Sequence, residues 1–152
     1  MTPIQLVART RDEVLGTLDT LSPEVRAQIS PQWLAQVQKS AQRDPWVHGF
    51  HVVNDAGLVV GLCGFKGPPT DGMVEIAYGI NPEHQGKGYA TSAARALTTY
   101  ALESAEVRIV RAHTLPDGVA SQSVLKKSGF AKTAEVIDPE DGLVWRFELG
   151  RG

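Results

Sequence analysis

The sequence predicts an α/β (α+β) domain built on a mixed, mostly antiparallel sheet that helices flank. Extended stretches separated by turn residues fill the region 48–80, and two more close the chain between 133 and 149, as hairpins do. Between these regions, residues 73–114 have the pattern strand, helix, strand. The two strands of that unit can lie parallel through a right-handed crossover, which makes the whole sheet mixed.

The composition is that of one soluble domain. The chain has 152 residues, of which 42% are hydrophobic and 21% charged. A net charge of −2 argues against nucleic acid as a partner. The single cysteine, Cys63, excludes an internal disulfide. We find no signal-peptide pattern and no apolar run near the roughly 20 residues of a membrane helix. A cytoplasmic protein without a membrane partner is therefore expected, as a monomer or a homodimer.

The N-terminal third is expected to be mainly helical. Residues 11–43 have helical spacing that Pro23 and Pro31 interrupt. Ser22 and Ser30 each precede one of these prolines, which is typical of an N-cap followed by proline at the first helical position. We therefore expect a new helix after each serine.

The remaining elements follow from periodicity and turn residues. The expected strands are residues 4–8, 48–53, 58–65, 73–80, 108–114, 133–137 and 143–149, and the later helices are 89–105 and 119–130. Pro45 is expected to end the N-terminal helical region. Gly129 stands where a helix would need a left-handed C-terminal residue.

A glycine-rich turn precedes the helix expected at 89–105. It has the sequence QGKGYA, with Gly86 and Gly88 on either side of Lys87. Glycine lets a ligand approach backbone amides closely, and a helix start carries free N–H groups and partial positive charge. These properties suit a phosphate, but a plain tight turn also needs glycine. The spacing matches neither a Walker A loop nor a dinucleotide-binding fingerprint.

Two segments resemble the GNAT N-acetyltransferase family. EIAYGINPEHQGKGYATSAARAL resembles the acetyl-CoA-binding segment of that family, whose Gln/Arg-x-x-Gly-x-Gly/Ala pattern matches here at Gln85, Gly88 and Ala90. TLPDGVASQSVLKKSGF is similar to the family's strand-to-helix segment ending in Gly-Phe, most like the ribosomal-protein N-terminal acetyltransferase branch. The resemblance covers nearly the whole chain and is most specific over residues 74–130.

The resemblance implies one acetyltransferase domain over residues 1–152. Residues 1–47 would supply the first strand and acceptor-side helices, 48–130 the acetyl-CoA-binding core, and 131–149 the final hairpin. It further implies a sheet of about six to seven strands whose central parallel pair splays apart around coenzyme A. The cofactor-binding residues it implies are Tyr78, Gly79, Ile80, Gln85, Gly86, Lys87, Gly88, Tyr89, Ala90 and Ser121. Acetyl-CoA would be the co-substrate, and no metal-ligand spacing is present.

Two residues depart from the family pattern. Gly118 stands where many relatives have an asparagine that orders the loop and contacts the cofactor. Leu125 stands where many relatives have a tyrosine that protonates the departing thiolate, and leucine cannot donate a proton. The usual general acid is therefore missing from its usual place.

Glu75 is the candidate general base for the incoming amine. It interrupts an apolar strand, on the face that alternation gives to Met73, Ala77 and Gly79. Partial burial would raise its pKa towards a useful range, and it could act through a water. The alternative is a glutamate on a solvated strand face or in a structural ion pair.

Ser121 is the second catalytic candidate. As the resemblance orders the elements, it lies at the start of the helix at 119–130, where its hydroxyl could donate to the thiolate. The alternative is a capping serine that binds the backbone of its own turn. The cofactor-site role is the stronger expectation for this residue.

The acceptor site is expected between the N-terminal helices and the hairpins. Its possible walls are Trp33, Trp46, Phe65 and Tyr78, for which ordinary core packing is the alternative. His48 and His51, three residues apart on one expected strand, would face opposite ways and share no site. Cys63 is expected to be a buried structural thiol.

These expectations give an acetyl-CoA-dependent N-acetyltransferase that acts by direct attack in a ternary complex. The acceptor is a protein N-terminus or a small-molecule amine. No activated nucleophile for an acyl-enzyme is evident. A catalytically silent coenzyme A-binding sensor and a protein-interaction module on the same fold remain alternatives.

Overall fold

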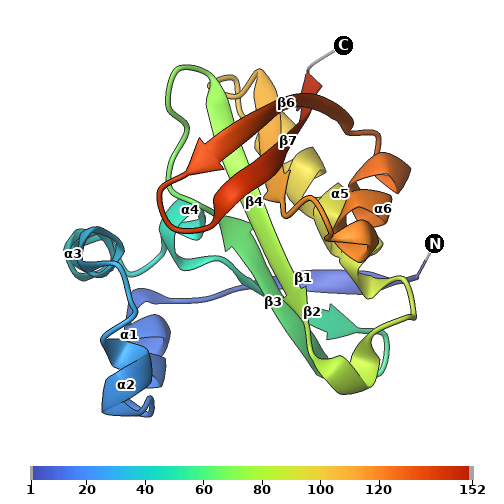
Figure 1. Ribbon diagram of the computed structural model, residues 1–152. Coiled ribbons are helices and arrows are strands. Elements are labelled where there is room, and N and C mark those ends of the chain that lie inside the picture. The colour runs from blue at the N-terminus through green and yellow to red at the C-terminus, as the bar shows by residue number, and fades with distance from the viewer. Residues whose placement is uncertain (1, 151–152) are drawn as a thin grey trace.

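The computed structural model describes residues 2–150 (Figure 1). The elements are β1 (Ile4–Ala8), α1 (Arg11–Asp19), α2 (Pro23–Arg26), α3 (Pro31–Lys39), α4 (Pro45–His48), β2 (Phe50–Asn54), β3 (Val59–Phe65), β4 (Met73–Ile80), the short 3-10 helix η1 (Pro82–His84), α5 (Tyr89–Leu102), β5 (Ile109–Thr114), α6 (Val119–Lys127), β6 (Ala131–Asp138) and β7 (Gly142–Gly150). The predicted order of strands and main helices is confirmed.

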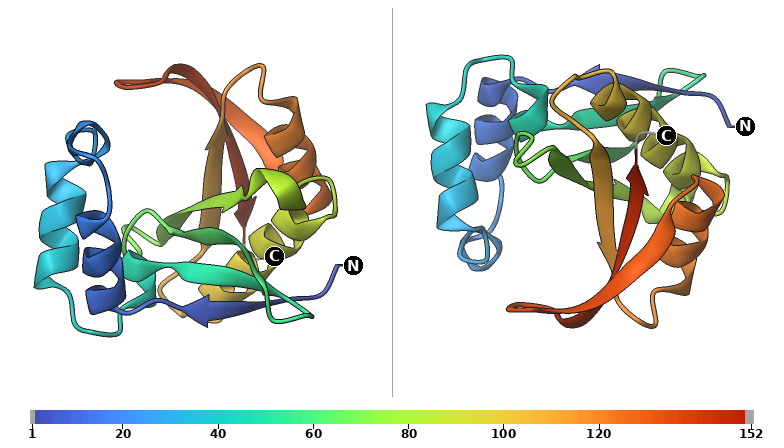
Figure 2. Two further views of the ribbon diagram at one scale, coloured as in Figure 1. Left: turned by 90° about the horizontal axis from the view of Figure 1, so that it is seen from below. Right: turned by 90° about the horizontal axis from the view of Figure 1, so that it is seen from above.

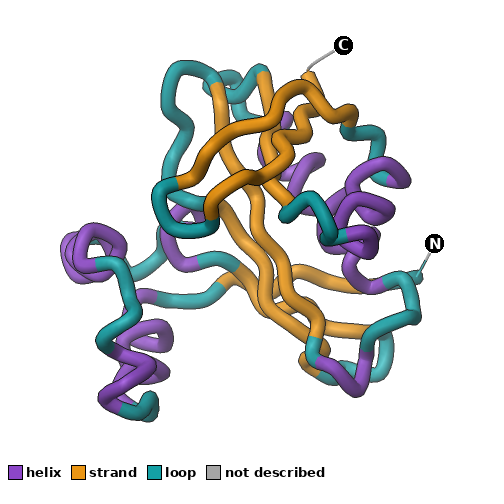
Figure 3. The backbone as a smooth tube through the Cα atoms, in the orientation of Figure 1, coloured by secondary structure: helices purple, strands orange, loops and turns teal. Residues whose placement is uncertain are grey.

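The strands form one mixed sheet of seven strands in the order β1-β2-β3-β4-β5-β7-β6. Within residues 2–150, only β4 and β5 pair in parallel, and every other neighbouring pair is antiparallel. In Figure 3 the strands form a curved layer with helices to both sides. The predicted fold class and the central parallel pair are both confirmed, because the crossover helix α5 connects β4 to β5 as the strand–helix–strand pattern requires.

The parallel pair separates part-way along its length. β4 and β5 are in register from Met73–Ile109 to Glu75–Arg111. Beyond that point β4 keeps pairing with β3 and β5 keeps pairing with β7. The ends of the two central strands therefore diverge while their outer neighbours hold them, and a wedge opens just after Glu75.

One face of the sheet packs against α5. The apolar stripe of this helix is made of small residues and one leucine, and it is fully buried: Ala93, Ala94, Leu97 and Ala101. From β4, Val74 and Ile76 point into the same core, so the intervening Glu75 points to the opposite face. The alternation predicted for this strand is thereby confirmed.

Helices α1, α2 and α3 form a separate group beyond the end of the sheet where β1 ends and β2 begins (Figures 1 and 2). Val14, Val37 and Val47 make a small core of their own there. The hydroxyls of Ser22 and Ser30 accept from the backbone N–H groups of Val25 and Trp33, which confirms both N-caps.

The prediction that Pro45 ends the helical region is wrong, since Pro45 begins α4. Proline is suited to a first helical position because its missing N–H has no acceptor there. His48 is consequently a helical residue rather than the start of a strand. The argument that His48 and His51 face opposite ways along one strand therefore does not apply.

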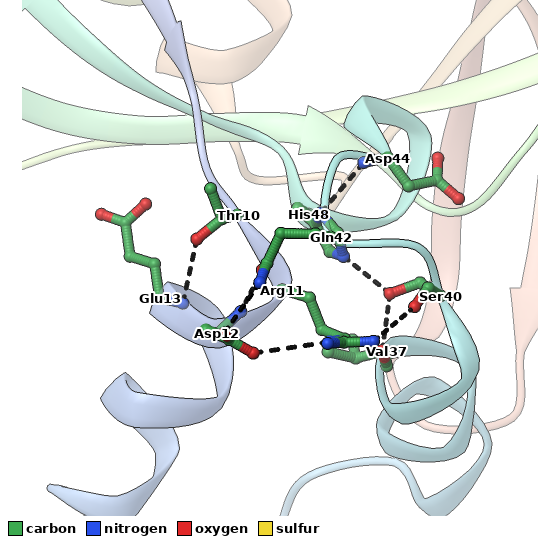
Figure 4. A network of polar contacts seen from close by, with 9 residues as sticks. All are labelled: Thr10, Arg11, Asp12, Glu13, Val37, Ser40, Gln42, Asp44 and His48. Atoms are coloured by element: carbon green, nitrogen blue, oxygen red, sulfur yellow. Dashed lines mark hydrogen bonds and ion pairs between the residues drawn. The ribbon is translucent and has the colours of Figure 1, made fainter.

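His48 lies inside a polar network that joins α1, the end of α3 and α4 (Figure 4). Its side chain is buried, with Nε2 2.7 Å from the Ser40 hydroxyl. The Ser40 hydroxyl donates to the Val37 carbonyl, and the Asp44 N–H donates to His48 Nδ1. His48 Nε2 is therefore the donor to Ser40, and the ring is a neutral structural imidazole.

Element ends differ from expectation by a few residues. The helix predicted to reach residue 105 ends at Leu102, and β6 and β7 are longer than predicted. Gly129 has a φ of 95°, which confirms the expected left-handed residue after α6.

Candidate functional site

A pocket of about 570 Å³ lies where the β4 end, the start of α5 and the first turns of α6 meet. Its lining residues are Tyr78, Gly79, Ile80, His84, Gln85, Gly86, Gly88, Tyr89, Ala90, Thr91, Ala120, Ser121, Ser123, Val124 and Lys127. Nine of the ten predicted cofactor-binding residues are in this set, brought together from β4, the glycine turn and α6. Lys87 is the exception, and its side chain is exposed beside the pocket.

The glycine turn has the backbone that only glycine adopts easily. Gly86 and Gly88 have φ values of 78° and 87°. A Cβ built on Gly86 would meet nothing within 4 Å, so this side of the turn faces open space. At Gly88 a Cβ would come 2.5 Å from the Thr2 hydroxyl oxygen. The turn therefore exposes its backbone directly to the pocket.

The start of α5 presents free donors to the same space. Gly88 is the N-cap and supplies no side-chain capping bond. The first intrahelical bond runs from the Ser92 N–H to the Gly88 carbonyl, so the helix geometry leaves the preceding N–H groups without a helical acceptor. These donors and the helix dipole make the site suitable for an anion such as a phosphate.

Two side chains brace the turn. Gln85 Nε2 donates to the Ile80 carbonyl over 2.9 Å, which ties the turn back to the end of β4. The Thr2 hydroxyl donates to the Lys87 carbonyl over 2.7 Å. The glycine backbone is thus held in place from the strand and from the N-terminal segment.

Tyr78 and Ser121 meet across the pocket. Burial raises the pKa of Tyr78 to about 12, and a side-chain hydrogen bond with Ser121 opposes that increase. At neutral pH the phenol therefore keeps its proton and can act as a donor in the pocket.

Glu75 lies at the point where β4 and β5 part, on the face opposite Tyr78. Its side chain is 18% exposed, and Oε2 lies 3.0 Å from Lys66 Nζ and 2.9 Å from His113 Nδ1. The carboxylate is therefore a member of an ion pair, and its role as general base stays a prediction. Both contacts are made by the same carboxylate oxygen, Oε2.

The hydrogen bonds around His113 define its tautomer. Arg146 Nε lies 3.1 Å from His113 Nε2, and an arginine can only donate. Nε2 is therefore the acceptor, and Nδ1 carries the proton donated to Glu75. This Arg146–His113–Glu75 chain crosses from β7 through β5 to β4. Sequence reasoning missed it, although His113 and Glu75 both interrupt apolar strands.

Gln122 is a second residue that sequence reasoning missed. It is buried, and its Nε2 donates to the carbonyls of Leu115 and Pro116 over 3.1 and 3.0 Å. It thereby holds the loop before α6, where Gly118 provides no side chain. Leu125 is fully buried in the core, so its side chain packs against the sheet.

The four proposed acceptor walls do not form one site. Trp33 and Phe65 line a separate hollow of about 760 Å³ between α3 and the end of β3. Trp46 packs in an aromatic cluster with Phe65 and Tyr100, at centroid distances of 4.7 and 5.5 Å. Tyr78 belongs to the pocket between β4 and α6.

The remaining reactive side chains have structural positions. Burial raises the pKa of the Cys63 thiol to about 12, which keeps it unreactive. Within residues 2–150, His, Cys, Asp and Glu form no group of three or more that could hold a metal ion. The described helices include none that is long and apolar enough to cross a membrane.

The family model described as "Acetyltransferase (GNAT) domain" matches residues 8–131. The chain belongs to the GNAT acetyltransferase family. The resemblance seen in the glycine turn and in the segment around α6 is thus confirmed at the level of the family.

Named relatives come from Bacillus. The chain is 38% identical over 88 residues to the uncharacterized N-acetyltransferase YjdG of Bacillus subtilis, a match that covers 57% of this chain and 51% of that protein. It is 28% identical over 102 residues to the uncharacterized N-acetyltransferase p20 of Bacillus licheniformis, covering 66% of this chain and 53% of that protein. The chain spans about half the length of the curated relatives it matches.

Solved structures share the fold over nearly the whole chain. A chimera of the spermidine N-acetyltransferase from Vibrio cholerae superposes with a TM-score of 0.73 at 16% identity, covering 97% of this chain and 95% of that one. An aminoglycoside acetyltransferase in complex with coenzyme A and kanamycin gives 0.70 at 21% identity, covering 98% and 95%. At sequence identities this low, the structural similarity shows a shared fold alone.

Proposed function

We propose that the protein is an acetyl-CoA-dependent N-acetyltransferase that moves an acetyl group to a primary amine by direct attack in a ternary complex. The observation that carries the proposal is the wedge between β4 and β5. On one side the wedge opens to the glycine-lined pocket, and on the other side it carries Glu75. A thioester that enters from the pocket and an amine that arrives beside Glu75 can meet there.

The residues present fit coenzyme A. The amides of the turn from Gln85 to Ala90 would hold the pyrophosphate, with Gly86 leaving open space for it. Backbone groups of Tyr78, Gly79 and Ile80 border the wedge and would pair with the pantetheine amides. A backbone N–H of that stretch would stabilise the thioester oxygen as negative charge develops.

Proton transfer is assigned to groups on opposite faces of the wedge. Glu75, directly or through a water, takes a proton from the amine as its nitrogen bonds to the acetyl carbon. The bond from that carbon to sulfur breaks, and the leaving thiolate takes the phenolic proton of Tyr78, which Ser121 orients. This assignment moves the general acid from the α6 position that Leu125 occupies to β4.

The acceptor is either a small-molecule amine or a protein N-terminus. The likeness to the ribosomal-protein N-terminal acetyltransferase branch in the segment around α6 supports a protein N-terminus. The structural neighbours named for spermidine and aminoglycosides support a small amine. Both acceptors would present an uncharged amine to Glu75.

The test is thiol release from acetyl-CoA with a panel of amines and peptides. Replacement of Glu75→Gln removes the base and should slow transfer by about 10²–10⁴-fold. Glu148→Gln is the matched control, because Glu148 has a similar exposed fraction (20%) and an ion pair with Arg111 on the neighbouring strands. It should keep the wild-type rate within a few-fold. Equal rates in wild type and Glu75→Gln would show that Glu75 is not the general base.

A catalytically silent coenzyme A sensor is the second candidate. The Lys66–Glu75 ion pair favours it, because one oxygen of the proposed base is already engaged by Lys66, and so does the burial of Leu125 in the core. A sensor predicts stabilisation by acetyl-CoA without amine-dependent thiol release. A protein-interaction module predicts neither.

A further inference from the structure

The hollow between α3 and the end of β3 has a composition unlike that of the coenzyme pocket. It has a volume of about 760 Å³ and is lined by Gln32, Trp33, Ala35, Gln36, Lys39, Phe65 and Lys66. None of these residues lines the pocket between β4 and α6. The hollow is therefore a second site, formed by the N-terminal helices beside the sheet.

Lys66 connects the hollow to the proposed base. Its ammonium group lies 3.0 Å from Glu75 Oε2, and its side chain is also part of the hollow's lining. An amine placed beside Glu75 would therefore have the rest of its molecule in or next to the hollow. Lys66 thus belongs both to the lining of the hollow and to the ion pair of the proposed base.

The charge of the lining selects among acceptors. It includes two ammonium groups, from Lys39 and Lys66, and no carboxylate. Lys39 has no ion-pair partner among residues 2–150, whereas Lys66 forms an ion pair with Glu75. A second positive charge on the acceptor would be repelled here and a negative charge attracted. The aromatic rings of Trp33 and Phe65 can cover an apolar portion of the same ligand.

We propose that this hollow is the acceptor subsite and that it takes a primary amine that also carries a carboxylate. Lys39 binds the carboxylate, Trp33 and Phe65 contact the middle of the molecule, and the amine reaches Glu75. This inference rests on the proposed function and narrows its substrate class. The proposed acceptor therefore belongs to a different chemical class from the polycations, such as polyamines and aminoglycosides, for which the structural neighbours are named.

The experiment compares acceptors in which an amine and a carboxylate stand at opposite ends of the molecule with the same amines lacking the carboxylate: 6-aminohexanoic acid with pentylamine, 4-(aminomethyl)benzoic acid with benzylamine, and lysine, through its ε-amine, with cadaverine. For each pair, kcat/KM is measured in wild type, Lys39→Met and Lys126→Met. Lys126 is the matched control, because like Lys39 it lies in the last turn of a helix but lines neither pocket. Dividing the acid-to-amine ratio of each variant by that of wild type cancels the different basicities of the two amines.

We expect the acid-to-amine ratio of kcat/KM to fall about tenfold or more in Lys39→Met, which is the range for the loss of a charged hydrogen bond. The ratio should stay unchanged in Lys126→Met. The same ratio in wild type and Lys39→Met overturns the inference. The inference is also overturned if wild type has the higher kcat/KM for the compound without the carboxylate in every pair and Lys39→Met does not change this preference.

A binding arm decides the matter independently of turnover. The N-acetylated forms of the same pairs are titrated by calorimetry in the presence of coenzyme A. Tighter binding of the carboxylate member in wild type, lost in Lys39→Met, supports the subsite. Equal binding, or no binding of any carboxylate member at millimolar concentration, overturns it. The proposed function fails in a different way, with no thiol release for any amine and no stabilisation by acetyl-CoA.

Discussion

His113 and Glu75 are joined across the opening of the central strands by a hydrogen bond of 2.9 Å from Nδ1 to Oε2. Because Arg146 donates to the other ring nitrogen, the imidazole can present only a donor to the carboxylate. The arrangement holds the Glu75 side chain on the face of the sheet that lies away from the glycine-lined pocket. We regard His113 as a positioning residue for the proposed base.

Replacement of His113→Phe should lower kcat about tenfold with little change in KM for acetyl-CoA, since only the orientation of Glu75 is lost. The conservative His113→Asn variant places an N–H near the position of Nδ1 and should recover most of the rate. Steady-state kinetics with one good acceptor amine measures both. If His113→Phe had the wild-type rate, the Arg146–His113–Glu75 hydrogen bonds would have a structural role only.

The glycine turn allows a matched pair of substitutions. Gly86 and Gly57 have φ values of 78° and 80°, and a Cβ on either would meet nothing within 4 Å. Gly86→Ala and Gly57→Ala should therefore carry the same backbone strain, about 1–2 kcal/mol. Only the Gly86 methyl group would occupy the proposed phosphate cradle.

Thermal unfolding with and without acetyl-CoA tests this pair. Ligand at about 100 times Kd adds roughly 2.7 kcal/mol to the free energy of unfolding and raises Tm by several degrees. Gly57→Ala should keep this increase and Gly86→Ala should lose most of it. An equal increase in both variants would show that coenzyme A does not use the turn.

Gln122→Leu should loosen the loop before α6. The substitution leaves the carbonyls of Leu115 and Pro116 without their donor and should cost about 1–3 kcal/mol of stability. Denaturant unfolding measures the loss, with the exposed Gln28→Leu as the control. We also expect weaker acetyl-CoA binding, because Ser121 is on the same first turn of α6. A stability unchanged from wild type would mean that Gln122 does not hold the loop.

His48 should make stability depend on pH. Burial lowers the pKa of His48 from its ordinary value of 6.5, and the negative charge of Asp44 and a hydrogen bond to the Arg9 backbone oppose this shift in part. The unfolded chain therefore binds the proton first as pH falls. The contribution of His48 is complete above pH 6.5 and is lost as pH falls below that value towards the folded pKa.

Unfolding at a series of pH values between about 5 and 8 measures this dependence. In His48→Gln the slope of stability against pH below 6.5 should decrease, although the variant is less stable overall. His84→Gln, at a site without a buried ring, should keep the wild-type slope. A wild-type slope in His48→Gln would assign the acid sensitivity to other groups.

Local patterns were sufficient for most of the fold. The serine–proline pairs predicted two helix starts, and alternation in the fourth strand predicted that Glu75 faces away from the core. Pro45 was misread because a proline is equally suited to follow one helix and to begin the next, and local sequence does not distinguish these cases.

Local sequence was enough to predict the glycine turn, the order of the strands along the chain and the family. These depend on residues that are close together in the chain, where backbone conformation and periodicity act. The tertiary structure decided which distant residues meet. Lys66, His113 and Arg146 reach Glu75 only because β3, β5 and β7 are brought beside β4 by pairing across the sheet. Such contacts depend on register and packing, which no local pattern encodes.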